Sequence, residues 1–367
     1  MPIHCEERLC VEGHIGVLTL DAPDTLNALS SQMIDEAQAA LDRWAEDSRI
    51  SLVMIQGQGD KAFCAGGDIQ ALYSVLQSPD AAANACHYFS NEYRLNFTLH
   101  RFPKPVIGWA NGVVMGGGLG LLAACRYRLV TPDLIMAMPE ISIGLFPDVG
   151  ASWFLNRLPE GLGLFMGLTG ARLNATDALR VGLADMAVYP HHRDSLLDQI
   201  QSQRWSGEAA TDDNRLYRLL NQLDSPPYPS LPESQLARHE QTIARLCQDG
   251  DLPDIVDRLL SEPATSDWWH ACIETLRGGC PTSAWLVQAQ LKHARQLSLK
   301  DIFRMELVMA TRCAERPDFA EGIRARLIDR DHAPQWSYST IRAVPSEVVE
   351  QHFVPPWHEQ DDPLTLD

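Results

Sequence analysis

The stretch VIGWANGVVMGGGLGL, residues 106–121, carries most of the information about the fold of this 367-residue chain. Its first five residues predict a buried strand, which Asn111-Gly112 ends with a turn. Three consecutive glycines, 116–118, then open an apolar helix. Glycine weakens a helix by about 0.5–1 kcal/mol per residue, so the triplet indicates a backbone that is approached closely. Tight packing of the helix on a sheet is the other explanation.

Strand and helix alternate on both sides of this stretch. An amphipathic helix is predicted at Ser31–Glu46, with Ser30 as its N-cap. Alternation of this kind predicts an α/β core with right-handed crossovers. The strands that we expect are His14–Leu20, Ser51–Gln56, Val106–Ala110, Tyr127–Thr131, Leu134–Met138 and Leu183–Val188.

After about residue 190 the pattern becomes helical, so we expect a core domain over residues 1–190 and a mainly helical region over 191–367. Within the core region, a helix is also predicted at Ala151–Leu158. The helices that we expect in the second region are Asp194–Arg204, Asp213–Leu223, Glu233–Cys247, Pro253–Ser261, Ser266–Arg277, Ser283–Gln296 and Leu299–Arg316.

The composition excludes several classes of protein. Lys plus Arg number 30 and Asp plus Glu 48, which gives a formal charge of −18 and argues against a nucleic-acid-binding protein. Nine scattered cysteines without a C-x-x-C pair suit a reducing compartment. We see no export signal and no run long enough to span a bilayer, so we expect a cytoplasmic protein without a membrane partner. His191-His192 lacks partners at ligand spacing, and we expect no metal.

A second glycine-rich segment is KAFCAGGDI, residues 61–69. A strand leads into small residues and Gly66-Gly67, which let a ligand approach the backbone closely. A helix then begins, and its first N–H groups have no acceptor within the helix. A glycine turn with Asp68 near the helix start is the other explanation. Two such turns, each presenting one N–H, can form an oxyanion hole, where losing one donor typically costs ~3 kcal/mol in the transition state.

The third segment is MAMPEISIGLFPDVG, residues 136–150, in which Glu140 and Asp148 stand among apolar residues. Burial there raises the pKa of a carboxyl group, as a general acid, a base or a carboxylate nucleophile requires. Each residue has another explanation from local pattern alone. Asp148 suits a helix N-cap, and Glu140 suits a solvated turn after Pro139.

Taken together and in this order, these segments resemble the crotonase (enoyl-CoA hydratase/isomerase) superfamily. The matching blocks are residues 63–68, 115–118 and 139–150, with Leu26-Asn27-Ala28-Leu29 before them. The resemblance implies a spiral of ββα turns with an extended helical C-terminal region. It also implies that two backbone N–H groups, at Gly67 and Gly117, hold an acyl-CoA thioester oxygen, and that Gly66 and Gly116 contact the substrate.

The hydratase pattern has a glutamate where this chain has Gly120, which argues against hydration by a glutamate pair. The segment from Phe146 to Gly150 looks like the 3-hydroxyisobutyryl-CoA hydrolase branch. So do the tail blocks at residues 280–283, 305–307, 318–325 and 327–331, and similarity runs from about residue 14 to about residue 353. The family's substrate-contacting glutamate falls on Glu92, which local pattern alone would make an exposed helix charge.

The resemblance therefore implies hydrolysis of a 3-hydroxyacyl-CoA, with 3-hydroxyisobutyryl-CoA of valine breakdown as the leading substrate. Glu140 attacks the carbonyl carbon or activates a water, and the sequence leaves both routes open. Asp148 orients the substrate hydroxyl or assists proton transfer, Glu92 holds the hydroxyl end, and Phe146 contacts the substrate. Arg330 is the expected partner of the CoA phosphates. Weaker candidates for those phosphates are Arg94, Arg101 and Lys104.

We expect no cofactor, because a thioester is already an activated acyl group and coenzyme A is part of the substrate. Two other functions stay open at this point. One is an enoyl-CoA hydratase or isomerase that uses Glu140 alone, and the other is a non-catalytic protein that binds CoA thioesters. A homo-oligomer through the C-terminal helices is implied by the family, although the longer tail could cover that surface.

Overall fold

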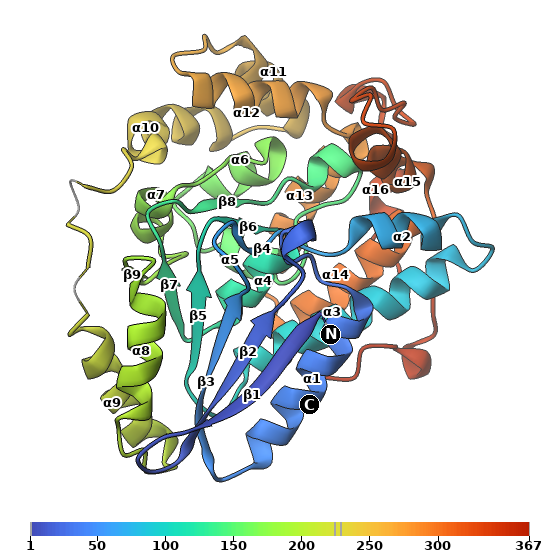
Figure 1. Cartoon of the computed structure of the whole chain (residues 1–367). Helices are drawn as coiled ribbons and strands as arrows, with labels where there is room; N and C mark the ends of the chain where they lie inside the picture. Colours follow the sequence, from blue (N-terminus) through green and yellow to red (C-terminus); the bar gives the residue numbers. More distant parts are fainter. Residues whose placement is uncertain (1, 224, 228–229, 367) are drawn as a thin grey trace. The chain divides into compact units, whose positions relative to one another are not determined.

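The computed structural model describes residues 2–223, 225–227 and 230–366. Figure 1 shows its helices and strands in chain order of colour. The chain forms two compact units. Unit 1 takes the residues up to 67, then 95–136 and 173–234, and unit 2 takes 68–94, 137–172 and the residues from 235 onward. Each unit contains residues from before and after residue 190. The division into a core domain at 1–190 and a helical region at 191–367 stays a prediction from the sequence pattern.

Unit 1 is built on a six-stranded sheet in the order β1-β2-β3-β5-β7-β9. Strands β1 and β2 pair antiparallel, and the remaining neighbours pair parallel. Every residue of β3 and β5 is buried, as parallel strands covered on both faces require. The strands are β1 Ile3–Leu9, β2 His14–Leu20, β3 Ile50–Gly57, β5 Val106–Ala110, β7 Tyr127–Val130 and β9 Met186–Ala187.

Helix α1, Ser31–Glu46, contacts β1 and β2. Ser30 caps it as predicted, because its side chain accepts a hydrogen bond from the Met33 N–H at 3.2 Å. A Cβ placed on Gly16 would lie 2.8 Å from the ring of Trp44. Glycine at position 16 of β2 therefore leaves room for the ring of Trp44 to pack closely against the strand.

Helices α8, His192–Gln201, and α9, Ala209–Leu220, lie beside the sheet of unit 1 (Figure 1). A hydrophobic cluster joins them to its strands. Trp109 on β5 and Trp205 before α9 are both buried in it. Trp205 also donates from its indole nitrogen to the Ile200 carbonyl at 2.9 Å, so its polar atom is satisfied inside the core.

A smaller three-stranded sheet follows the order β4-β6-β8 and leads to helix α4, Gly117–Ala124. Its strands are β4 Ala62–Cys64, β6 Val113–Met115 and β8 Ile135–Ala137. A Cβ on Gly118 would lie only 2.2 Å from the Cys64 carbonyl oxygen. The glycine triplet thus brings the start of α4 against the end of β4, which is the tight packing that the sequence offered as the other explanation.

Unit 2 is mainly helical. Aromatic side chains of α3, α14 and α15 meet in its interior, where the rings of Tyr93 and Phe303 lie 6.0 Å apart and those of Phe89 and Phe319 6.3 Å apart. Helix α3, Ala81–His100, ends within unit 1. The other helices of unit 2 include α2 Ile69–Leu76, α5 Ala151–Leu155, α6 Leu162–Thr169, α10 Gln235–Cys247, α11 Leu252–Ser261, α12 Asp267–Gly278, α13 Pro281–Ala294, α14 Leu299–Ala314, α15 Pro317–Ile323 and α16 Ser346–Gln351.

The short 3-10 helix η2, Glu140–Ile143, is fixed in unit 2 by glycine contacts with α15. A Cβ on Gly322 would lie 2.3 Å from the Ile143 carbonyl carbon, and one on Gly144 would lie 2.4 Å from the Asp318 carbonyl oxygen. Gly144 also has a φ of +74°, which favours glycine for conformational reasons.

The predicted alternation of strands and helices is confirmed, and the seven helices expected after residue 190 are all present with ends within four residues. The last predicted strand is shorter than expected, with only Met186 and Ala187 paired. The predicted helix at 151–158 ends at Leu155. Strand β1 was not predicted, because Glu6, Glu7 and Arg8 on this edge of the sheet hide its apolar pattern.

Candidate active site

The two glycine-rich segments lie side by side within unit 1. Strand β4 pairs parallel with β6, and each strand ends at a glycine turn. A Cβ on Gly66 would lie 3.1 Å from the Met115 carbonyl oxygen and 3.6 Å from the Gly117 nitrogen. Gly66 has a φ of +106° and Gly116 a φ of +48°, so both positions favour glycine.

The proposed donors Gly67 and Gly117 belong to these adjoining turns. Gly117 is the first residue of α4, and its N–H therefore has no acceptor within the helix. Gly67 forms an isolated bridge with Leu29, in which the Leu29 N–H donates to the Gly66 carbonyl at 2.7 Å. The geometry thus brings the two predicted glycine stretches together.

Three predicted carboxyl groups are buried in unit 2. Glu92 on α3 is 3% exposed, Glu140 at the start of η2 is 5% exposed, and Asp148 in the turn before α5 is 4% exposed. The negative charge of Asp148 acts on both glutamates, so the three groups belong to one electrostatic cluster. The explanations from local pattern, which made Glu140 solvated and Glu92 an exposed charge, are wrong.

The Asp148 turn is held by hydrogen bonds from two helices. The Tyr93 hydroxyl donates to Asp148 Oδ2 at 2.7 Å. The buried carboxyl group of Glu306, on α14, accepts from the N–H groups of Gly150 at 2.7 Å and Ser152 at 2.9 Å. Gly150 is the N-cap of α5, so the alternative in which Asp148 caps that helix is also wrong.

Burial is the largest cause of the raised pKa values of these groups, because it penalises the charged form of a carboxyl. Desolvation raises the pKa of Asp148 to about 6, although the Tyr93 hydrogen bond opposes this. Desolvation and the charge of Asp148 hold the pKa of Glu140 and that of Glu92 well above their usual range. Desolvation also raises the pKa of Glu306 to about 8, against the pull of its hydrogen bonds.

Glu140 has one oxygen, Oε2, that is buried without a hydrogen-bond partner in the structure. A buried carboxyl oxygen of this kind costs free energy unless a ligand or water satisfies it. Together with its raised pKa, this is the environment that a general base or a carboxylate nucleophile requires. Beside it, Asp148, with a pKa raised to about 6, can hold and transfer a proton at slightly acidic to neutral pH.

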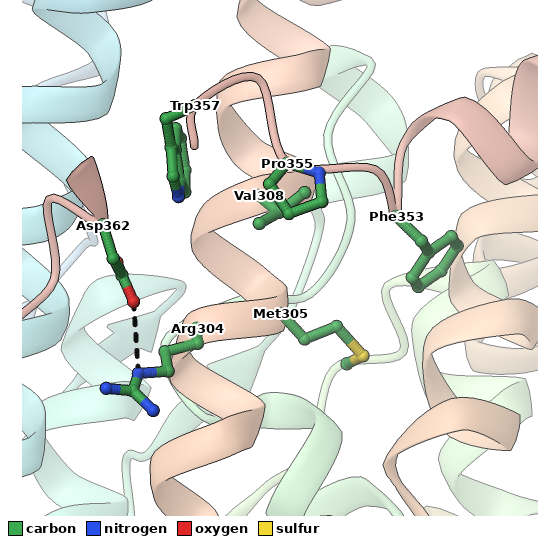
Figure 2. Close-up of a pocket in the computed structure, with 7 residues that line it drawn as sticks. All are labelled: Arg304, Met305, Val308, Phe353, Pro355, Trp357 and Asp362. Atoms are coloured by element: carbon green, nitrogen blue, oxygen red, sulfur yellow. Dashed lines mark ion pairs between the residues drawn. The ribbon is translucent and has the colours of Figure 1, made fainter. Parts of the chain in front are cut away.

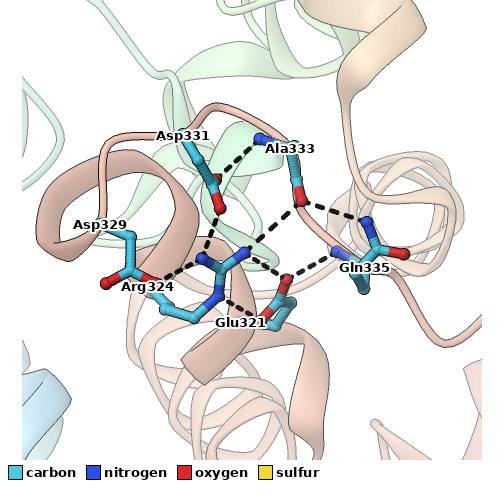
Figure 3. Close-up of polar contacts among 6 residues, drawn as sticks. All are labelled: Glu321, Arg324, Asp329, Asp331, Ala333 and Gln335. Carbon is cyan, nitrogen blue, oxygen red and sulfur yellow. Dashed lines mark hydrogen bonds and ion pairs between the residues drawn. The ribbon is translucent and has the colours of Figure 1, made fainter.

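The remaining predicted contacts differ in their surroundings. Phe146 is fully buried in unit 2, and Arg330 is exposed with a φ of +57°. Arg330 follows a network centred on Arg324, whose guanidinium contacts Asp329 at 2.6 Å and Asp331 at 2.7 Å (Figure 3). Lys104 in unit 1 donates to the carbonyl oxygens of Trp44 and Asp47. It therefore satisfies carbonyl groups at the C-terminal end of α1.

A pocket of about 450 Å³ opens elsewhere in unit 2, between α14 and the chain that follows α16. Figure 2 shows the Arg304–Asp362 ion pair, 3.3 Å long, at one end of its mainly apolar lining. None of the predicted site residues lines this pocket. Its lining residues are Arg304, Met305, Val308, Phe353, Pro355, Trp357 and Asp362.

Among the residues that hold the Asp148 turn, sequence reasoning missed Tyr93 and Glu306. A signal for Glu306 was present, because it lies on the apolar stripe of its helix with Ile302, Phe303 and Ala310, where a charge is unexpected. Tyr93 had no comparable signal, since an aromatic residue on a helix usually belongs to the core.

Two kinds of feature are missing from the part of the chain that the structure describes. Over residues 2–223, 225–227 and 230–366, no group of three or more His, Cys, Asp or Glu side chains is placed to hold a metal ion. None of the described helices combines the length and the apolar character needed to cross a membrane.

Comparison with known proteins places these features in a family. The chain is 38% identical over 346 residues to "3-hydroxyisobutyryl-CoA hydrolase, mitochondrial" of Danio rerio, a match that covers 93% of this chain and 87% of the relative. It is 34% identical over 345 residues to "3-hydroxyisobutyryl-CoA hydrolase 1" of Arabidopsis thaliana, covering 92% of this chain and 89% of that protein.

Solved structures confirm the fold that the resemblance implied. An enoyl-CoA hydratase from Rhodobacter sphaeroides 2.4.1 matches with a TM-score of 0.85 at 31% identity, covering 100% of both chains. A carnitinyl-CoA dehydratase from Mycobacterium thermoresistibile matches with a TM-score of 0.84 at 31% identity, covering 99% of this chain and 98% of that one. A family model described as enoyl-CoA hydratase/isomerase matches residues 15–353. The chain therefore belongs to the enoyl-CoA hydratase/isomerase family.

Proposed function

We propose that this protein hydrolyses the thioester bond of a short 3-hydroxyacyl-CoA, with 3-hydroxyisobutyryl-CoA as the leading substrate and valine breakdown as the setting. The observation that carries the proposal is the buried carboxyl cluster of Glu92, Glu140 and Asp148, in a chain that has Gly120 where the hydratase pattern has a glutamate. The relatives from Danio rerio and Arabidopsis thaliana, both named as 3-hydroxyisobutyryl-CoA hydrolases, support the same reaction.

The proposed reaction needs hydrogen-bond donors for the thioester oxygen, and we assign this role to the N–H groups of Gly67 and Gly117. Donors that are fixed before the reaction stabilise the developing oxyanion without reorganisation. Gly66 and Gly116, whose positive φ values form the two turns, allow the substrate to approach the backbone closely.

The reaction also needs a group that delivers oxygen to the carbonyl carbon, and we assign this role to Glu140. Direct attack gives a mixed anhydride and releases CoA thiolate, and water then cleaves the anhydride. In the second route, Glu140 removes a proton from water, which attacks the carbonyl instead. Both routes yield the carboxylic acid and free CoA, and both need Glu140 in its charged form.

Asp148 and Glu92 complete the proposed site. Asp148, with a pKa raised to about 6, supplies a proton to the departing thiolate or orients the substrate hydroxyl. Glu92 binds the hydroxyl end of the acyl group, Phe146 forms an apolar wall, and Arg330 binds the CoA phosphates. The proposal includes no cofactor, because the thioester is already activated.

An assay of thiol release tests the proposal. Purified protein is mixed with a panel of 3-hydroxyacyl-CoA, saturated acyl-CoA and enoyl-CoA esters, and free thiol is followed with a chromogenic disulfide. We expect the fastest release from 3-hydroxyisobutyryl-CoA. Absence of thiol from every ester would overturn the proposal, and binding of CoA esters without turnover would leave a non-catalytic binding protein.

A second function is favoured by the two structural neighbours, a hydratase and a dehydratase, each 31% identical to this chain. Reversible addition of water to an enoyl-CoA would use Glu140 as its acid and base. Loss of enoyl absorbance without thiol release would identify this reaction. Following both free thiol and enoyl absorbance with the enoyl-CoA esters of the panel therefore separates the two functions.

Cellular location and assembly are part of the proposal. We propose a cytoplasmic protein, whereas the Danio rerio relative is named as mitochondrial. Cell fractionation with an antibody to the chain tests the location. A homo-oligomer formed through the C-terminal helices stays a prediction, and sedimentation velocity measures it directly.

A further inference from the structure

Glu306 is a fully buried carboxyl group to which the proposed reaction assigns no role. Residues that flank it on α14, including Phe303, Leu307 and Ala310, belong to the hydrophobic core. Burying a carboxyl there is costly unless hydrogen bonds or charges compensate it. What Glu306 contacts therefore indicates what it does.

Both oxygens of Glu306 contact one turn. Oε2 accepts from the Gly150 N–H at 2.7 Å, and Oε1 accepts from the Ser152 N–H at 2.9 Å. Gly150 lies two residues after Asp148, and the residue between them, Val149, has a φ of +52°. A β-branched residue adopts that conformation only where its surroundings enforce it.

Two further contacts hold the same turn from other helices of unit 2. Gln290 on α13 donates from Nε2 to the Pro147 carbonyl at 2.8 Å. Tyr93 on α3 donates to the Asp148 carboxyl itself at 2.7 Å. The residues before, at and after Asp148 are thus each anchored, and Glu306 supplies the anchor on the C-terminal side.

We propose that Glu306 is a positioning residue of the proposed reaction, which holds the Asp148 carboxyl in its reactive orientation by binding the Gly150 and Ser152 amides. The role rests on the proposed function, and Glu306 itself touches no substrate in this account. The negative charge of Asp148 also contributes to raising the pKa of Glu306, after the larger effect of desolvation.

The Glu306→Gln variant tests the role with a nearly unchanged volume. A carboxamide keeps one acceptor oxygen but turns an NH₂ group toward the second amide, so one of the two contacts becomes repulsive. We expect kcat for thiol release to fall at least tenfold while KM changes less than threefold. Glu306→Asp, which keeps both acceptors but is shorter, should retain more of kcat than Glu306→Gln.

The matched control is Glu315→Gln at the end of the same helix, where the exposed carboxylate pairs with Arg312. It should leave kcat and KM within twofold of the wild type. Hydrogen exchange followed by mass spectrometry gives a readout independent of activity. Peptides that cover Gly150 and Ser152 should exchange faster in Glu306→Gln and unchanged in the control.

A double-mutant cycle with Asp148→Asn then separates positioning from a general loss of structure. If Glu306 acts through Asp148, adding Glu306→Gln to Asp148→Asn should lower kcat less than twofold further. An equal, multiplicative loss in both backgrounds would overturn the proposal. So would a kcat for Glu306→Gln, or for Glu306→Asp if the first variant does not fold, that equals the wild-type value.

Failure of the proposed function gives a different result. A wild-type protein that releases no thiol from any ester overturns that function, and the positioning role with it. A wild type that releases thiol, combined with a fully active Glu306→Gln variant, overturns the positioning role alone.

Discussion

At the scale of single residues, the most informative group is Glu140. Its carboxyl is buried, its pKa is raised by desolvation and by Asp148, and Oε2 has no hydrogen-bond partner in the structure. A group kept in this state without a ligand costs stability, which is typical of a residue retained for chemistry. The strongest test of the proposed function therefore falls on this side chain.

Glu140→Gln should lower kcat for thiol release by roughly 10²–10⁴-fold, because an amide can neither attack the carbonyl nor remove a proton from water. Binding of CoA esters, measured by calorimetry, should change little. The exposed Glu160 offers a control, and Glu160→Gln should keep wild-type kinetics. Full activity of Glu140→Gln would remove Glu140 from the reaction.

Isotope labelling tests direct attack by Glu140. In a single turnover in ¹⁸O-labelled water, attack of water on the anhydride at its glutamyl carbonyl puts ¹⁸O into the Glu140 side chain. Mass spectrometry of the peptide that contains Glu140 detects the label, which would identify the anhydride route. Label found only in the acid product excludes attack at the glutamyl carbonyl, and is expected both from the general-base route and from an anhydride that water cleaves at its acyl carbonyl.

Arg330 is exposed, and its expected effect on binding is correspondingly small. Arg330→Gln should raise KM for a CoA thioester about two- to fivefold, as exposed ion pairs contribute up to about 1 kcal/mol. A pantetheine thioester, which lacks the nucleotide phosphates, should show no change in KM. Arg295→Gln, another exposed arginine, is the control. An equal rise in KM for both substrates would argue against a phosphate contact.

At the scale of elements, the position of η2 depends on α15. The Cβ of an alanine at residue 322 would lie 2.3 Å from the Ile143 carbonyl carbon, a distance that real side chains essentially never show. Because a backbone atom rather than a flexible side chain is in the way, one of the two elements must move. The element that carries Glu140 is thus positioned by a glycine almost two hundred residues later in the sequence.

Gly322→Ala should destabilise the protein by about 1–3 kcal/mol, the usual cost of overpacking, and should lower kcat by displacing η2. Gly278→Ala is the matched control, because a Cβ at residue 278 meets nothing within 4 Å. Denaturant unfolding and thiol release measure both effects. A Gly322→Ala variant with wild-type stability and kcat would show that η2 and α15 are not in contact.

At the scale of the whole molecule, the buried carboxyls make stability depend on pH. Their pKa values in the folded state are raised, so the neutral forms suit the fold and the charged forms oppose it. The contribution of each group is complete below its pKa in the unfolded chain and is lost as the pH rises through its pKa in the folded state. For Glu306 this window runs from pH 4.5 to about 8, and for Asp148 from 3.8 to about 6.

The thermal midpoint of Glu306→Gln relative to the wild type should therefore rise between pH 4.5 and 8, because the amide has no charge to bury. The corresponding rise for Asp148→Asn should be complete by about pH 6. Differential scanning fluorimetry at half-unit steps of pH measures both. A flat difference for Glu306→Gln would contradict the raised pKa.

How far the sequence predicts the molecule depends on the range of the interactions. Helix α1 and strand β5 have the predicted bounds, because a cap, a turn dipeptide and a period of apolar residues are local signals. The apolar segment around Glu140 and Asp148 predicted buried carboxyls with raised pKa values, whereas Glu92 was predicted only through resemblance. The alternatives from local pattern, a solvated Glu140, an exposed Glu92 and a helix cap at Asp148, proved wrong.

The sequence alone determined the α/β class, the glycine turns and the helical character of the second half, since each follows from neighbouring residues. The tertiary structure decided which charges are buried and which helices anchor the Asp148 turn. Gln290, Glu306 and Tyr93 meet that turn from distant parts of the chain. Burial and hydrogen bonding of a side chain depend on what packs against it, and sequence spacing does not encode this.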